Sequence, residues 1–157
     1  MKQLRKLKAN FSGGMISFVV FSITFLLMGP FTELNGKARS IGVFILGMVF
    51  WLTLILGLVF SFRVNKLCRE VQEPVGKKRT PAICRFFSNS AAAVADFGLT
   101  VGVAGIAVLA LYPPEKQYFY FVELFLIALS LSMHCLLNSN AFQAIQTLKN
   151  KNWRAER

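Results

Sequence analysis

Three ionisable side chains stand inside long apolar stretches of this sequence, and they are the residues best placed to do chemistry. They are Asp96, Glu123 and His134. Carboxylates and imidazoles in such surroundings can relay protons or bind cations, and they can equally pair to hold two helices together. Placing each one in a membrane costs about 2.5–3.5 kcal/mol on insertion scales, so each needs a stabilising partner or a function.

Residue counts predict which of these groups meet. We expect helices over 91–112 and 118–139 to form an antiparallel hairpin whose turn centres on Glu115. Asp96 and His134 each lie nineteen residues from Glu115. Because a helix rises ~1.5 Å per residue, the acid and the imidazole should lie at the same depth. Two interpretations remain open: a structural pair that locks the hairpin, or part of a proton or cation relay.

A longer polar column follows from helical rotation. Glu123 and Ser130 share a stripe with His134, since seven and eleven residues bring a helix back to the same face at ~100° per residue. Thr100 shares a face with Asp96. If the two stripes meet, Glu123 lies toward the outside of the membrane, and Ser130 and Thr100 lie near its middle. Glu123 is also near enough to the outer end to reach the headgroups.

Motifs for catalysis are not found in the sequence. It contains no G-x-S-x-G, no H-E-x-x-H and no phosphate-binding glycine loop. One histidine excludes a multi-histidine metal site, and Cys68, Cys84 and Cys135 lack C-x-x-C or Cys/His ligand spacing. We therefore expect no enzyme activity, no cofactor and no metal.

The fold class follows from four apolar runs. Hydrophobic residues make up 55% of the 157-residue chain, and sixteen are Phe. Uncharged runs of about 18 residues or more are typical of bilayer-spanning helices. They predict one all-α polytopic membrane domain over 1–157, with helices at about 11–31, 41–62, 91–112 and 118–139. Residues 63–90 form a loop and 140–157 a tail.

The basic residues predict the orientation. Fifteen of the 18 Lys and Arg residues precede the first run, lie between the second and third, or follow the fourth. By the positive-inside rule, both termini and the loop 63–90 should face the cytoplasm of a cell with this protein in its plasma membrane. The net charge of +11 then reflects topology and attraction to anionic lipids on the cytoplasmic side, rather than nucleic-acid binding.

The loop 63–90 has further organisation. The segment "RVNKLCREVQ" can continue the second helix into the cytoplasm, and "EPVG" then ends it. A short helix lying in the membrane interface is expected after Pro81. Its lipid-facing anchors, or alternatively its docking residues for a partner protein, would be Arg79, Arg85, Phe86 and Phe87.

A stripe of small residues marks the third expected helix. Ala95, Gly98, Gly102 and Gly105 recur at spacings of three and four. Small residues let another helix backbone approach closely, so we expect this helix to be the buried one, packed against the fourth helix, the first helix or a second copy of the chain. Gly29-Pro30 should end the first helix, since proline can stop a helix there.

Two segments carry a resemblance. "RTPAICRFFSNSAAAVADF" and "MHCLLNSNAFQAI" resemble segments of an uncharacterised family of small four-helix membrane proteins of Gram-positive bacteria. The matching residues are Arg79, Pro81, Phe86, Phe87, Ser88, Asn89, Asp96, His134, Cys135 and Asn138. After Asn138 this chain has "SNAFQ" where the family has "GKNY". The resemblance implies a bacterial plasma membrane and no particular activity.

These observations leave two functions open. The first is a non-catalytic accessory, regulatory or immunity-type subunit that binds a membrane-protein partner. The second is a small homo-oligomeric transporter or channel that uses Asp96, His134 and Glu123 for coupled protons or cations.

Overall fold

The protein is all-α in a computed structural model that describes residues 2–34, 36–72, 90–137 and 141–155. Four of its helices are long and apolar enough to cross a membrane. The helices are α1 (Lys2–Glu33), α2 (Gly36–Gln72), α4 (Ser90–Leu111), α5 (Tyr118–Leu137) and α6 (Ala141–Ala155). The continuation of the second helix through the segment "RVNKLCREVQ" is confirmed, because α2 ends at Gln72.

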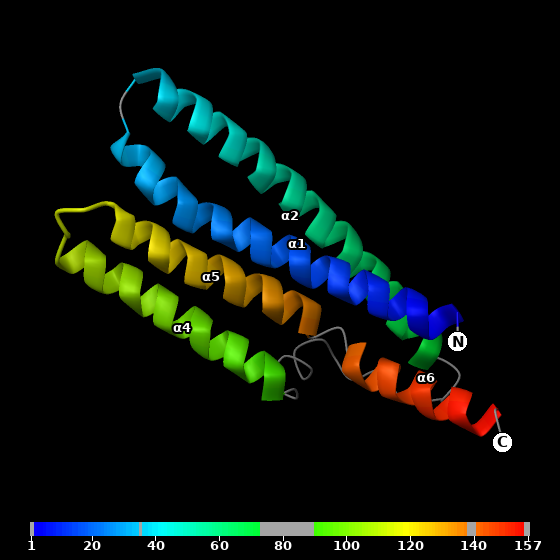
Figure 1. Ribbon diagram of the computed structural model, residues 1–157. Coiled ribbons are helices and arrows are strands. Elements are labelled where there is room, and N and C mark those ends of the chain that lie inside the picture. Colours follow the sequence, from blue (N-terminus) through cyan, green and yellow to red (C-terminus); the bar gives the residue numbers. More distant parts are fainter. Residues whose placement is uncertain (1, 35, 73–89, 138–140, 156–157) are drawn as a thin grey trace.

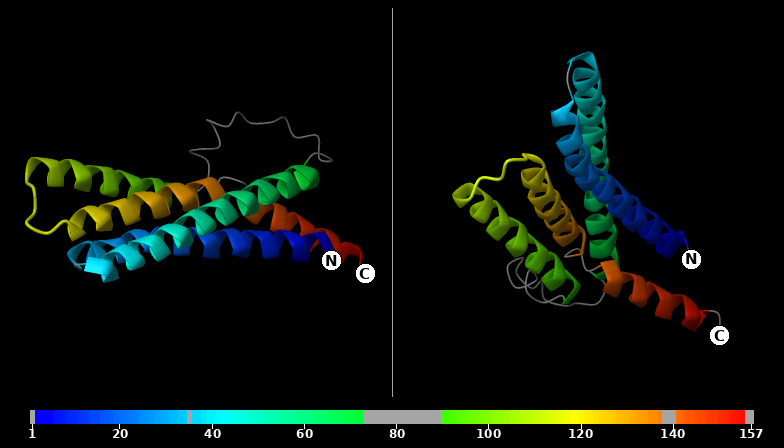
Figure 2. Two further views of the ribbon diagram at one scale, coloured as in Figure 1. Left: turned by 90° about the horizontal axis from the view of Figure 1, so that it is seen from above. Right: turned by 60° about the vertical axis from the view of Figure 1, so that its left-hand side comes forward.

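The four long helices stand side by side in the order α2, α1, α5, α4 (Figure 1). α1 packs against α2 on one side and against α5 on the other, whereas α4 packs against α5. Figure 2 shows the hairpin α1–α2 diverging from the hairpin α4–α5 toward one end. Only 6% of the apolar stretch of α2 is buried, against 28% of that of α1. Such an open row suits a bilayer, where lipid covers the bare faces.

Glycine and phenylalanine make the contact between α1 and α2. A Cβ on Gly57 of α2 would lie 2.5 Å from the ring of Phe18, and one on Gly13 of α1 would lie 2.9 Å from the ring of Phe60. Each helix thus presents a glycine to a ring of the other. Further along, Phe50 stacks at centroid distances of 4.9 and 5.5 Å on two Phe rings of α1, Phe21 and Phe25.

Both ends of α1 differ from the sequence-based bounds. It begins at Lys2 instead of near residue 11, because Leu7 gains a fully buried place on the face shared with its neighbours. It also continues past Pro30 to Glu33, so the expectation that Gly29-Pro30 ends the helix is wrong. Proline removes one hydrogen bond near the end of the helix, and the last residues continue beyond it. The turn that follows uses Gly36 at φ +67°, a left-handed conformation that favours glycine.

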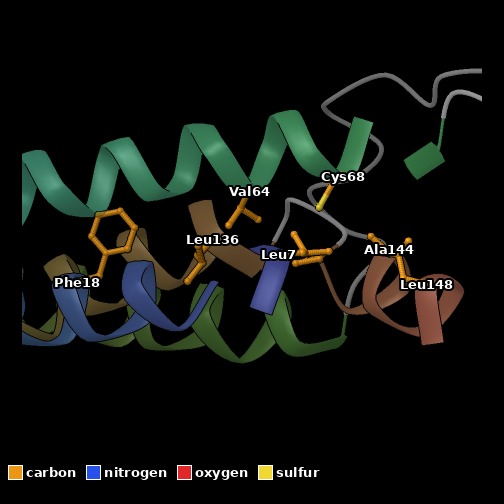
Figure 3. Packing of buried hydrophobic residues seen from close by; sticks show 8 residues of the cluster. Leu7, Phe18, Val64, Cys68, Leu136, Ala144 and Leu148 are labelled. Atoms are coloured by element: carbon orange, nitrogen blue, oxygen red, sulfur yellow. The ribbon is translucent and has the colours of Figure 1, made fainter. Parts of the chain in front are cut away.

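A fifth helix, α6, lies where the sequence suggested only a tail. Its buried residues Ala141, Ala144 and Leu148 follow helical spacing and pack against the first turns of α1 and the last turns of α2 (Figure 3). Leu7 and Val64, both fully buried, belong to the same cluster, as do Phe18, Cys68 and Leu136. Most of this cluster therefore lies beyond the apolar runs, toward the end that carries both termini (Figure 1).

Within one copy of the chain, the third long helix is not the buried one, although its small residues do pack against the fourth long helix. Only 11% of the apolar stretch of α4 is buried, and α4 lies at the edge of the row. Its stripe of small residues receives one close neighbour, α5. Close approach along one face does not require neighbours on the other faces, and α1 takes the central place instead.

Replacing Gly57 by leucine should destabilise the α1–α2 hairpin. Phe18 is 2% exposed and has no room to move aside, so overpacking should cost about 1–3 kcal/mol. The matched control is Gly47→Leu on the same helix, since a Cβ there meets nothing within 4 Å. Unfolding of both variants in detergent by circular dichroism measures the difference. Equal stability of the two variants would contradict this packing.

Candidate functional site

The contact face between α4 and α5, called the seam below, contains the side chains of Asp96, Glu123 and His134. Nδ1 of His134 lies 2.7 Å from Oδ1 of Asp96, and this contact joins the last turn of α5 to the first half of α4. The imidazole is almost fully buried, whereas the aspartate side chain is 27% exposed. The contact is an ion pair when the imidazole is protonated. It is therefore suited both to locking the hairpin and to holding a proton.

The glycines of α4 all face α5. The Ser130 hydroxyl occupies the space where Gly98 lacks a side chain, at 2.5 Å from the position of a Cβ. At Gly102 a Cβ would lie 2.8 Å from the side-chain carbon Cγ1 of Ile127 and 3.3 Å from its amide nitrogen. Helix backbones this close gain van der Waals contact that lipid cannot match. Ala95, the fourth member of the stripe, is also buried.

Glu123 turns into the seam near the opposite end. Its carboxylate fills the space beside Gly105, so closely that a Cβ there would overlap it. Oε2 is buried and has no hydrogen-bond partner among the residues that the structure describes. Burying a polar atom without a hydrogen-bond partner costs free energy, so this carboxyl group is a candidate for a functional role.

The polar column is only partly assembled. Glu123, Ser130 and His134 all contact α4 from one face of α5. Thr100 is exposed instead, and its hydroxyl donates to the Asp96 carbonyl oxygen of its own helix at 2.9 Å. Threonine in a helix commonly satisfies its hydroxyl this way, so it needs no partner across the seam.

The outward face of α4 is a second row of small or short side chains. Ala93, Thr100, Ala104 and Ala107 are exposed there, and the large apolar side chains of Phe97 and Leu111 are exposed on the same side. The exposed face of α2 differs in degree, since between residues 41 and 62 every exposed side chain is large and apolar. They include Phe44, Met48, Trp51, Leu52, Ile55 and Phe62. The alanine row is visible in the sequence as Ala93, Thr100, Ala104 and Ala107, which recur at spacings of seven, four and three.

Other site predictions are placed as follows. The expected elbow residues Arg79, Arg85, Phe86 and Phe87 lie outside the described residues. Across the described ranges, no three His, Cys, Asp or Glu side chains come together as a metal site needs. At the turn, the Tyr120 hydroxyl donates to the carbonyl oxygen of Leu109 at 2.9 Å and ties the two helices together.

No protein-family model matches the chain, and no curated protein or solved structure is significantly similar to it. The resemblance to small four-helix membrane proteins of Gram-positive bacteria stays a prediction. What the chain does must be inferred from its own residues.

The Asp96–His134 contact should be measurable as a coupling free energy. We expect Asp96→Ala and His134→Ala to be non-additive by about 0.6–1.7 kcal/mol, the range known for polar contacts between membrane helices. The measurement is a double-mutant cycle of unfolding in detergent. As a control, Thr100→Val should show no coupling with His134→Ala, because Thr100 bonds to its own helix. An additive cycle would show that the 2.7 Å contact does not hold the hairpin.

Proposed function

We propose that this chain is a non-catalytic subunit of a membrane complex, of the accessory, regulatory or immunity type. It would stand in the plasma membrane with four spanning helices and both termini in the cytoplasm. The observation that carries the proposal is the outward face of α4, where Thr100, Ala104 and Ala107 are exposed between the larger side chains of Phe97 and Leu111. These short side chains would let the backbone of another membrane helix approach closely.

The orientation is supported by charge. Among the described residues, basic side chains gather in the first turns of α1, in the last turns of α2 and in α6, at the end where both termini lie (Figure 1). The opposite end carries only Lys37, Arg39 and Lys116. Positive charge concentrates on the cytoplasmic side of membrane proteins, so the termini are assigned to that side.

Two contrasts support a partner on α4. Lipid-facing surfaces carry large apolar side chains, as α2 does, whereas helix–helix interfaces in membranes are enriched in Gly, Ala, Ser and Thr. The Asp96 side chain is also 27% exposed on α4. An ionisable side chain within a spanning helix normally faces other protein, so a neighbouring helix would cover it. The occupant we propose is a spanning helix of a different integral membrane protein.

Enlarging the outward face should break the complex without unfolding the subunit. We expect Ala104→Leu with Ala107→Leu to lower the amount of partner that co-purifies by at least about tenfold, because leucine keeps two helix backbones apart. Ile55→Phe on the exposed face of α2 is the control and should leave co-purification unchanged. Photo-crosslinking from position 104, compared with position 55, identifies which protein lies against α4.

The outcomes separate the possibilities. A discrete crosslink from position 104 to a second protein, lost in the leucine variant, supports the proposal. Crosslinks from position 104 to lipid alone, with purification of the chain by itself, would overturn it. Crosslinks to a second copy of this chain would favour the homo-oligomer.

One observation favours the second candidate, a homo-oligomeric transporter or channel. Glu123 buries a carboxylate oxygen that has no hydrogen-bond partner within the described residues. Asp96 and His134 lie toward the other end of the seam. Together with Glu123 they would pass protons or cations from one residue to the next. A single row of four helices encloses no path, so this function needs several copies.

Flux measurements decide between the two candidates. We expect liposomes that contain the purified protein to leak protons no faster than protein-free liposomes, because the seam groups of one copy line no open path. Flux that is lost in Glu123→Gln and retained in Glu115→Gln would instead support the transporter. Glu115 is a fair control, since it is exposed on the turn between α4 and α5.

A further inference from the structure

A polar pocket lies between α1 and α2, away from the seam of α4 and α5. Its volume is about 450 Å³. Its lining residues come from the first turns of α1 and the last turns of α2: Lys6, Asn10, Arg63, Lys66, Leu67 and Glu70. Lys6 and Asn10 are four residues apart, and Arg63, Lys66 and Glu70 follow at three and four. The polar faces of α1 and α2 therefore face each other across the pocket.

The charge of this pocket is uncompensated. Three cations face one carboxylate, that of Glu70. Within the described ranges, no salt bridge joins Lys6, Arg63 or Lys66 to an acid. The Asn10 side chain is buried and uses one amide hydrogen on the carbonyl oxygen of Lys6, at 2.7 Å, which leaves its second hydrogen as a further donor. The pocket thus offers donors and a net positive charge.

The position of the pocket along the membrane normal indicates which class of ligand it binds. Asn10 immediately precedes the apolar run 11–31, and Arg63 immediately follows the run 41–62. The pocket therefore lies where the apolar core of a bilayer gives way to phosphate groups. Leu67 adds an apolar wall, which a purely polar solute would not need.

We infer that this pocket binds the phosphodiester headgroup of one anionic phospholipid. Arg63 presents a planar guanidinium, which matches two phosphate oxygens, while Lys6 and Lys66 add point charges. Leu67 contacts the first carbons of the lipid. Glu70 repels a second negative charge, so a singly charged lipid is preferred. Basic pockets between spanning helices on the cytoplasmic side recognise lipid headgroups in this way. The site does not depend on the partner proposed for α4.

Native mass spectrometry of the whole protein in detergent, at 0.15 M ionic strength, tests the site. The probes are phosphatidylglycerol, phosphatidylcholine with the same acyl chains, and inorganic phosphate. We expect one phosphatidylglycerol to bind at least tenfold more tightly than phosphatidylcholine. Saturation by inorganic phosphate at the same concentration, with no preference for phosphatidylglycerol, would identify a free-phosphate site and overturn the lipid assignment.

Two sets of charge-neutralising variants locate the binding. Lys6→Gln, Arg63→Gln and Lys66→Gln together should weaken phosphatidylglycerol binding by about two orders of magnitude, at roughly fivefold for each cation. The control set removes the same residue types at the opposite end: Lys37→Gln, Arg39→Gln and Lys116→Gln. Lys37 and Arg63 are 26 residues apart on α2, or ~39 Å, which is far beyond the ~8 Å screening length.

A third variant keeps the test decisive if the triple variant fails to fold. Glu70→Gln removes the one acid among the described residues that line the pocket and should strengthen phosphatidylglycerol binding about fivefold. Equal weakening in the pocket set and the control set would show diffuse attraction and overturn the inference. An unchanged affinity in Glu70→Gln would overturn it as well.

Discussion

Close approach between helix backbones is the interaction on which the apolar part of this protein depends. Lipid tails are as apolar as leucine, so two apolar side chains that meet in a bilayer gain little hydrophobic free energy. What remains is van der Waals contact, which increases where glycine lets a neighbour come near. Phe18 lies against Gly57 in one hairpin, and Ile127 lies against Gly102 in the other. In both hairpins a glycine thus makes the close contact, against an aromatic ring in one and against the side chain and backbone of an isoleucine in the other.

Beyond the apolar runs a different force holds the helices. There water surrounds the chain, and burying a leucine side chain contributes about 1.5–3 kcal/mol. Leu7, Val64, Ala144 and Leu148 pack together at this end, and the first two are fully buried. Leu136, also fully buried, links this cluster to α5. The protein thus combines an open row of long apolar helices with a buried cluster of apolar side chains toward one end.

The elements and one register could be predicted from the sequence, but the neighbours of each helix could not. Apolar length predicts a spanning helix, and the fixed rise of a helix is enough to bring Asp96 level with His134. Rotation is less constrained, so Thr100 was expected in the seam and lies outside it. A stripe of small residues indicates one close neighbour and says nothing of the other faces, which is why α4 was expected to be enclosed. α6 could not be predicted because Leu148 lies in a polar segment. The apolar face of α6 finds its packing surface only where α1 and α2 lie side by side.

The docking of α6 also bears on how the protein is made. Leu7 and Leu148 belong to one cluster although most of the chain separates them. During synthesis the apolar surface around Leu7 and Val64 stays open to water until α6 leaves the ribosome. Until then a chaperone or a protease can recognise that surface. An incomplete chain would therefore differ from a finished one by an exposed apolar patch at the membrane surface, where cellular quality control can act on it.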